Sequence, residues 1–262
     1  MKTLSAWMLA SVLSASIVVP EARAQVLIGA DSVVDWGDAS VSMGCTDLVV
    51  NGTANMSAAR LSEVDSVNIS GVLNNGSGQL SVAGNLATTG TLQGGAGTVS
   101  IVDGCARTTS QITGSPSFHN LSISTTTGKQ VVFEAGKTTT VGGQLALQGA
   151  SGNLLKIRSS VAGTPALLSA TDQQVVQFVD VGDNRAVGSV IAPGEPTLFQ
   201  SSSAGNIFRW FLFNEDGVIP KEPEPQIAAV PTLGDWALYV LSLLIALLGY
   251  RNVSRRAQLE RP

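Results

Sequence analysis

Short segments in which apolar residues alternate with polar ones recur along this chain and constrain its fold more than any other feature. Between Asp47 and Phe213 their starts lie roughly ten to twenty residues apart, which leaves no room for helices between them. A period of two is typical of strands, because successive side chains of a strand point to opposite faces. With 28 glycines and only 13% charged residues, the pattern predicts an all-β fold. The apolar pairs are Leu48/Val50, Val67/Ile69, Leu80/Val82, Val99/Ile101, Leu121/Ile123, Val131/Phe133, Leu145/Leu147, Leu155/Ile157 and Val176/Phe178.

Two architectures use many short strands at this spacing: a β-sandwich built from hairpins, and a solenoid whose strands stack from coil to coil. Asn51-Gly52 and Asn75-Gly76 are turn pairs that favour hairpins. Residues 131–149 instead place small residues where a solenoid needs corners. An aromatic content of 5% suits a narrow bore filled by Val, Leu, Ile and Ala, so the residues alone leave both architectures open.

The stretch FHNLSI, followed by VVFEAGKTTTVGGQLALQG, resembles the repeats of bacterial secreted β-helix proteins. The resemblance covers residues 117–213, implies a right-handed parallel β-helix, and is silent on activity. We therefore predict solenoid-like repeats for residues 116–213, with a β-sandwich as the alternative. Residues 25–115 contain similar short alternating segments but match the repeat less well, so they form either further coils or an amino-terminal cap.

Residues 1–24 have the organisation of an export signal. A lysine near the start precedes the mostly apolar residues 4–19, and Ala22 and Ala24 offer the small side chains that signal peptidase needs. A membrane-spanning anchor is the alternative, but serines interrupt the short apolar run and a proline ends it. We expect signal peptidase to cleave before Gln25.

A proline-rich stretch, residues 214–229, is typical of a linker. After it, residues 236–250 carry no charge and would rise roughly 22 Å as a helix, against a hydrocarbon core of about 30 Å. Arginines follow at once, and positive charge stays on the cytoplasmic side of a membrane. The tail therefore predicts a short transmembrane helix with the body outside, held by the basic residues Arg251, Arg255 and Arg256.

The order of parts in this tail resembles the IPTL-CTERM protein-sorting domain, which has Ile-Pro-Thr-Leu, a Trp three residues on, a hydrophobic span and a basic end. The matching residues here are Val230, which replaces the Ile, then Pro231, Thr232, Leu233 and Trp236. The resemblance covers residues 230–256 and implies a Gram-negative bacterium in which an exosortase-type membrane enzyme processes the tail. It also implies export through the inner membrane to the cell envelope or outer surface. A permanent membrane anchor is the alternative.

Cysteine count and charge restrict the partners of the body. After export, Cys45 and Cys105 would meet an oxidising compartment, where an even count favours a disulfide. Two thiols alone do not make a zinc site, and we expect no metal and no cofactor. Residues 25–220 carry eight Lys or Arg against fourteen Asp or Glu, a formal charge of −6 without a basic run, so nucleic acid is a poor partner.

No catalytic residue is predicted. His119 is the only histidine, and the residues around it do not supply a nucleophile, so we expect an exposed position on a strand. The densest polar cluster is Asp180, Asp183, Asn184 and Arg185, with Asp172 just before it. β-Helix enzymes that act on polysaccharides pair carboxylates on one face. Because Asp and Asn beside a glycine are also ordinary turn residues, we interpret the cluster as a turn.

These observations predict an exported, envelope-sorted surface protein with a structural, adhesive or matrix role, and an exopolysaccharide or envelope glycan as a candidate partner. A surface polysaccharide-active β-helix enzyme and a permanently membrane-anchored binding module are the alternatives. Carboxylates aligned on adjacent coils would favour the enzyme. An uninterrupted face of Ser, Thr and Asn would favour the scaffold.

Overall fold

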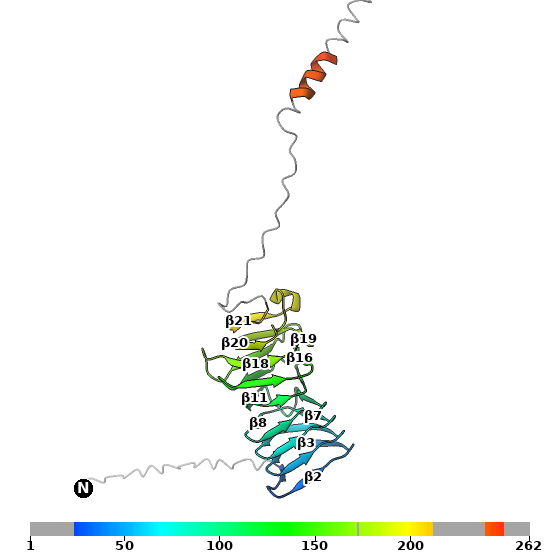
Figure 1. Cartoon of the computed structure of the whole chain (residues 1–262), viewed down its shortest axis with the longest axis vertical. Coiled ribbons are helices and arrows are strands. Elements are labelled where there is room, and N and C mark those ends of the chain that lie inside the picture. The colour runs from blue at the N-terminus through cyan, green and yellow to red at the C-terminus, as the bar shows by residue number, and fades with distance from the viewer. Residues whose placement is uncertain (1–23, 172, 212–238, 249–262) are drawn as a thin grey trace, which may run out of the picture. The chain divides into compact units, whose positions relative to one another are not determined.

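The computed structural model describes residues 24–171, 173–211 and 239–248. The chain divides into two compact units, Met1–Pro220 and Lys221–Pro262. The first unit contains a β-solenoid of about eight turns, which Figure 1 shows as a stack of coils. Every pairing between named strands in the described residues is parallel. The β-sandwich alternative, which needs antiparallel hairpins, is therefore wrong; the right-handed winding stays a prediction.

Each coil runs over three faces, and the pairing of strands from coil to coil defines them. The first face consists of the starts of β3 (Ser40–Val50) and β5 (Arg60–Ile69), then β7 (Gln79–Val82), β10 (Thr98–Ile101), β13 (Asn120–Ser124), β16 (Leu145–Gln148) and β19 (Gln174–Gln177). The second face consists of β1 (Gln25–Ile28), the ends of β3 and β5, β8 (Leu86–Thr88), β11 (Thr109–Gly114), β14 (Gln130–Phe133), β17 (Leu155–Ser159) and the starts of β20 (Val179–Gly188) and β21 (Ser202–Phe208).

The third face begins as a separate sheet of four short strands. These strands are β2 (Val33–Asp35), β4 (Thr53–Asn55), β6 (Val72–Asn74) and β9 (Thr91–Gln93). The face continues through β12 (Ser117–Phe118), β15 (Thr138–Val141), β18 (Ala166–Ala170) and the ends of β20 and β21. One 3-10 helix, η1 (Pro196–Phe199), precedes β21.

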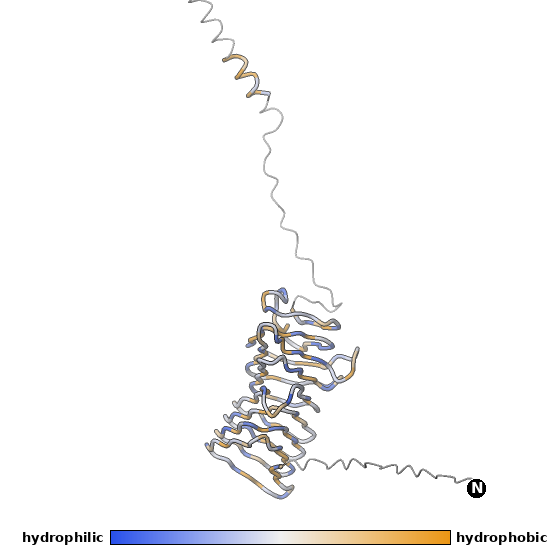
Figure 2. The backbone as a smooth tube through the Cα atoms, turned by 180° about the vertical axis from the view of Figure 1, so that it is seen from behind, coloured by the Kyte–Doolittle hydropathy of each residue, from blue (hydrophilic) through white to orange (hydrophobic). Residues whose placement is uncertain are grey.

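The core forms because the apolar alternation stays in register from one coil to the next. On the first face, Leu61, Leu80, Val99, Leu121 and Leu145 are successive partners, and each is at most 1% exposed. Figure 2 shows the corresponding change between hydrophobic and hydrophilic residues along the tube. Full burial of such a side chain contributes about 1.5–3 kcal/mol, so stacking identical positions stabilises every coil in the same way.

One corner of the coil is built from glycines. Gly52, Gly71 and Gly90 lie 19 residues apart, at the change from the second face to the third. A Cβ atom on Gly71 would lie 2.0 Å from the backbone oxygen of Gly52, and one on Gly90 would lie 2.1 Å from that of Gly71. Backbones of successive coils therefore approach here to a distance that only glycine permits.

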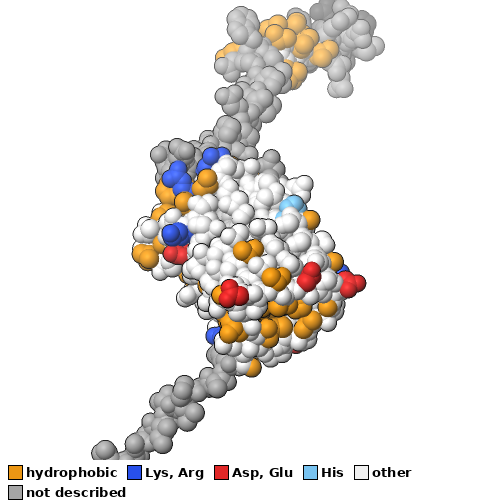
Figure 3. All heavy atoms as spheres, turned by 60° about the horizontal axis from the view of Figure 1, so that its bottom comes forward, with side chains coloured by type: hydrophobic (Ala, Val, Ile, Leu, Met, Phe, Trp, Pro, Cys, Tyr) orange, Lys and Arg blue, Asp and Glu red, His pale blue; other side chains and the backbone are white. Residues whose placement is uncertain are grey.

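The first coil leaves its end of the stack partly uncovered. Val26, Leu27 and Val33 are 39%, 54% and 69% exposed, because β1 and β2 each pair with a neighbour on one side only. Figure 3, which brings this end forward, shows apolar side chains gathered there with acidic side chains around them. Charged groups beside an open sheet edge oppose uncontrolled pairing with other chains.

Candidate functional site

A continuous column of serine side chains runs along the outside of the first face. Ser42 pairs with Ser62, Ser81 with Ser100, and Ser100 with Ser122. Ser62 and Ser81 line the same surface hollow, so the column continues between those two pairs. It ends where Ala146 follows Ser122. Stacked strands are about 4.8 Å apart, so the column presents one hydroxyl group per coil at a regular spacing.

Beside the serines, a second column holds the longer polar side chains of the same face. Its successive partners are Ser40, Arg60, Gln79, Thr98 and Asn120. Arg60 Nη1 donates a hydrogen bond to Gln79 Oε1 at 2.8 Å, and Asn120 Nδ2 donates to Thr98 Oγ1 at 3.4 Å. The two columns together make a face of Ser, Thr, Asn and Gln with one arginine.

The first face is hollowed around Arg60. The hollow has a volume of about 470 Å³, which lies in the range of small-ligand sites. Glu63 lies at its edge, where the carboxylate accepts a hydrogen bond from the Ser42 hydroxyl. The lining residues are Ser40, Val41, Ser42, Arg60, Leu61, Ser62, Gln79 and Ser81.

A disulfide joins Cys45 and Cys105, as predicted, with their Cα atoms 5.4 Å apart. Cys45 lies in β3, whereas Cys105 lies in the corner between β10 and β11. In this corner Arg107 donates two hydrogen bonds to the buried Asp65 carboxylate of β5, at 2.7 and 2.6 Å. The corner therefore turns back over the preceding coils, and both a covalent bond and an ion pair hold it there.

Lys129 secures the same corner from inside. The residue is 1% exposed, and its Nζ donates to the backbone oxygens of Ala83 and Arg107, both at 2.7 Å. Burial lowers the pKa of Lys129, because the charged amine loses its water. Nearby, burial acts to raise the pKa of Asp103, but hydrogen bonds from Thr126, Thr125 and Thr127 outweigh it and lower that pKa. Both groups therefore connect neighbouring coils.

The polar cluster of residues 180–185 is not a turn, so that interpretation was wrong. These residues lie in β20, which contains a register shift after Val181. Residues of neighbouring coils bind the polar side chains of this cluster. Asp180 pairs with Arg158 and accepts from Ser202 at 2.9 Å, and Asp183 accepts from Asn206.

The rest of the cluster is also structural. Asn184 is fully buried and accepts from Trp210 Nε1 at 2.9 Å, while Arg185 lies 5.5 Å from the ring centroid of Phe208. These groups do not converge on a common point. Asp172 lies outside the described residues.

His119 connects β12 to β13 and is half-buried, not exposed as expected. Its backbone oxygen accepts a hydrogen bond from Gly143 N at 2.7 Å. Within the described parts of the chain, no group of three or more His, Cys, Asp and Glu side chains is placed to hold a metal ion.

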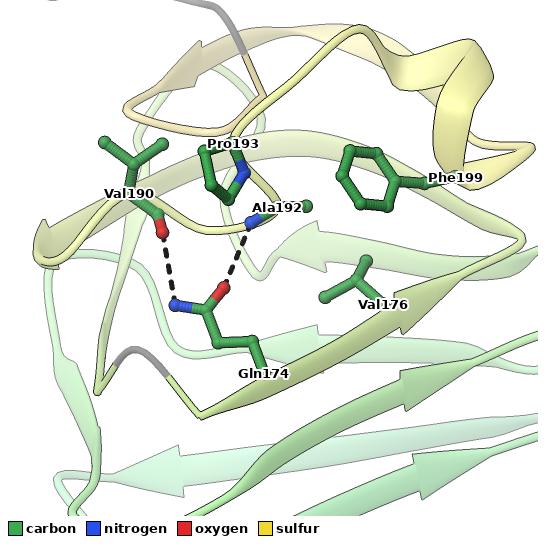
Figure 4. A pocket seen from close by; sticks show the side chains of 6 residues that line it. All are labelled: Gln174, Val176, Val190, Ala192, Pro193 and Phe199. Carbon is green, nitrogen blue, oxygen red and sulfur yellow. Dashed lines mark hydrogen bonds between the residues drawn. The ribbon is translucent and has the colours of Figure 1, made fainter.

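A smaller pocket of 260 Å³ lies near the last coils and is mostly apolar (Figure 4). Gln174 supplies its main polar side chain. Its Nε2 donates to the oxygen of Val190 at 3.1 Å, and its Oε1 accepts from Ala192 N at 3.0 Å. Because both ends of this amide already bind backbone, the pocket offers little to recognise a polar ligand. The lining residues are Gln174, Val176, Val190, Ala192, Pro193 and Phe199.

In the second unit, residues 239–248 form a helix. Its large apolar side chains, from Tyr239 to Leu248, are 50–71% exposed. No helix in the described residues is long and apolar enough to cross a membrane. The remainder of the predicted span and of the signal peptide lies outside the described residues, as do the sorting residues Val230 to Trp236, the three arginines and Ala22. Ala24 and Gln25 are described, and Gln25 begins β1.

A comparison with known protein families decides the nature of this tail. Residues 228–257 match the IPTL-CTERM motif. The chain carries an IPTL-CTERM sorting motif beside a β-solenoid body. Such a motif indicates a surface-exported protein that an exosortase-type enzyme processes. No curated protein and no solved structure matches the chain.

Sequence reasoning missed Arg60. A signal was present, because Arg60 is the only Lys or Arg between residues 25 and 106. Its position beside the serine column became apparent only from the register of β3, β5 and β7.

Proposed function

We propose that this protein is sorted to the cell envelope of a Gram-negative bacterium and displays its solenoid there in a structural, adhesive or matrix role. The polar part of the first face, which continues from β3 to β13, supports the proposal most directly. It presents hydroxyl and amide groups at a regular spacing, as a surface that contacts an extended polymer requires. We also propose that the body is not an enzyme, because Asp65, Asp180 and Asp183 are already engaged by side chains of other coils.

The adhesive role is tested by placing charge on the first face. Ser62→Glu with Ser100→Glu introduces two carboxylates on alternate coils and should reduce attachment of cells to matrix or to other cells. Ser115→Glu with Ser151→Glu places the same charges at exposed positions outside the serine column and is the matched control. Thermal unfolding of both variants checks that the solenoid is intact. Equal attachment by both variants would contradict a role for this face.

Sorting is tested by intact-mass measurement of the mature envelope protein. If signal peptidase and the exosortase-type enzyme both act, the mass should correspond to a chain that begins at Gln25 and lacks the apolar tail. A mass that still includes residues 236–262 would show a permanent anchor.

A further inference from the structure

The hollow of the first face combines hydroxyl groups with the positive charge of Arg60, and the Glu63 carboxylate lies at its edge. Between residues 25 and 106 the sequence has one basic residue, Arg60, and seven acidic residues. They are Asp31, Asp35, Asp38, Asp47, Glu63, Asp65 and Asp103. An anion that approaches this half of the body is therefore repelled over most of the surface and attracted at Arg60.

The hydrogen bonds of Arg60 leave most of its donors available. The side chain is exposed, and within the described residues it makes the one bond to Gln79. A guanidinium group has five N–H donors in a fixed plane, so four remain for a ligand. The bond to Gln79 orients that plane beside the serine column and lowers the entropy that binding would cost.

The groups around Arg60 suit a sugar. Hydroxyls of Ser40, Ser42, Ser62 and Ser81 line the same hollow, and a hydroxyl group both donates and accepts hydrogen bonds, as the hydroxyls of a sugar do. Beyond the hollow, the serine column continues through Ser100 and Ser122. A polymer lying along the stacking direction would meet one further hydroxyl about every 4.8 Å.

We propose that this hollow binds an anionic polysaccharide, with one acidic group of the polymer on Arg60 and its hydroxyls along the serine column. A carboxylate fits the planar guanidinium through two parallel hydrogen bonds, and a sulfate ester offers the same acceptors. The inference rests on the proposed adhesive function and adds the chemical class of the partner.

The experiment compares polymers that differ only in charge. Polygalacturonate and its fully methyl-esterified form share one backbone, and dextran sulfate with dextran provides the same comparison for sulfate. Binding to the mature protein, extracted from the envelope in detergent, is measured by calorimetry or by retention on immobilised polymer. At least one charged polymer should bind about tenfold more tightly than its neutral counterpart, and the difference should shrink as salt is added.

Variants assign the charge dependence to one residue. Arg60→Gln should abolish the preference for the charged polymer, whereas Arg60→Lys should retain part of it, since lysine keeps the charge and loses the planar fork. Arg185→Gln removes an exposed arginine from the third face and should change nothing. Equal binding of charged and neutral polymers, an unchanged preference in Arg60→Gln, or no binding of any polymer would overturn the inference. The adhesive role would survive those results if Ser62→Glu with Ser100→Glu still reduced attachment.

Discussion

The disulfide between Cys45 and Cys105 should contribute a large share of the stability of the solenoid. The two residues are separated by 60 positions. For a loop of that size the chain-entropy relation gives a loss of about 14 cal/mol/K from the unfolded chain, or about 4 kcal/mol at 25 °C. We therefore expect Cys45→Ala with Cys105→Ala to lower the free energy of unfolding by about 4 kcal/mol.

The folded state should keep its geometry in that variant. The Asp65–Arg107 ion pair and the two hydrogen bonds from Lys129 still hold the corner between β10 and β11. The change then acts mainly on the unfolded chain, so circular dichroism of the folded protein should not differ.

Glycine at both positions provides a matched control. Cys45 and Cys105 have φ angles of 60° and 49°, in the left-handed region that costs other residues roughly 1–2 kcal/mol. Cys45→Gly with Cys105→Gly removes the same cross-link but relieves this strain, although glycine also makes the unfolded chain more flexible. The glycine pair should be no less stable than the alanine pair if the cross-link is the main contribution.

Equilibrium unfolding in guanidinium chloride, followed by tryptophan fluorescence and by circular dichroism, measures the effect. Coincident transitions are needed, because stacked coils can unfold in segments. A loss below about 1 kcal/mol would refute the reasoning. It would mean that the coils between the cysteines keep their structure when the remainder unfolds.

Three further predictions address the corner, the buried lysine and the tail. Gly71→Ala should destabilise the solenoid by about 1–3 kcal/mol or more in thermal unfolding, because the new Cβ would lie 2.0 Å from a backbone oxygen. Gly142→Ala is the control and should have little effect, because the nearest atom to its new Cβ is 3.8 Å away. Burial lowers the pKa of Lys129 below 10.5, so just below that pH the unfolded chain binds more protons than the folded chain. The free energy of unfolding should therefore rise with pH in that range, and Lys129→Met should remove the rise. Replacing Pro231 and Trp236 should leave an unprocessed, membrane-retained form on immunoblots of envelope fractions, and normal processing would exclude recognition through this motif.

The alternation of apolar residues was sufficient to predict a fold of short strands because that signal is local, whereas the choice of a solenoid over a sandwich came from the resemblance of residues 117–213 to β-helix repeats. A strand with buried residues at every second position shows its alternation within a few residues, as Leu80 and Val82 do. The glycine corner was also readable, since Gly52, Gly71 and Gly90 repeat at intervals of 19 residues. That interval is a more direct indication of a coil than the apolar pairs, because a hairpin does not require it.

Features that depend on contacts between neighbouring coils could not be predicted from the sequence. Asp180, Asp183 and Asn184 have the composition of a turn, yet they lie in a strand, because the next coil supplies Ser202, Asn206 and Trp210 as partners. Their partners lie 22 to 26 residues away in the chain. The even cysteine count predicted the disulfide, but nothing local indicated that the corner carrying Cys105 turns back toward β3.

The same dependence explains why the candidate site is harder to predict than the fold. Inward positions must be apolar for the coils to stack, and the tightest corners must be glycine, so both leave a recognisable signature. Outward positions carry no such requirement, and a serine there is informative only when the serines of adjacent coils are known to align with it. Arg60 and Ser62 are two positions apart on β5, and the regular pairing of Ser40 with Arg60 and of Ser42 with Ser62 places them on one face. Recognition by a solenoid is therefore a property of the register between coils, and Arg60 acquires its significance from residues 19 positions away along the chain.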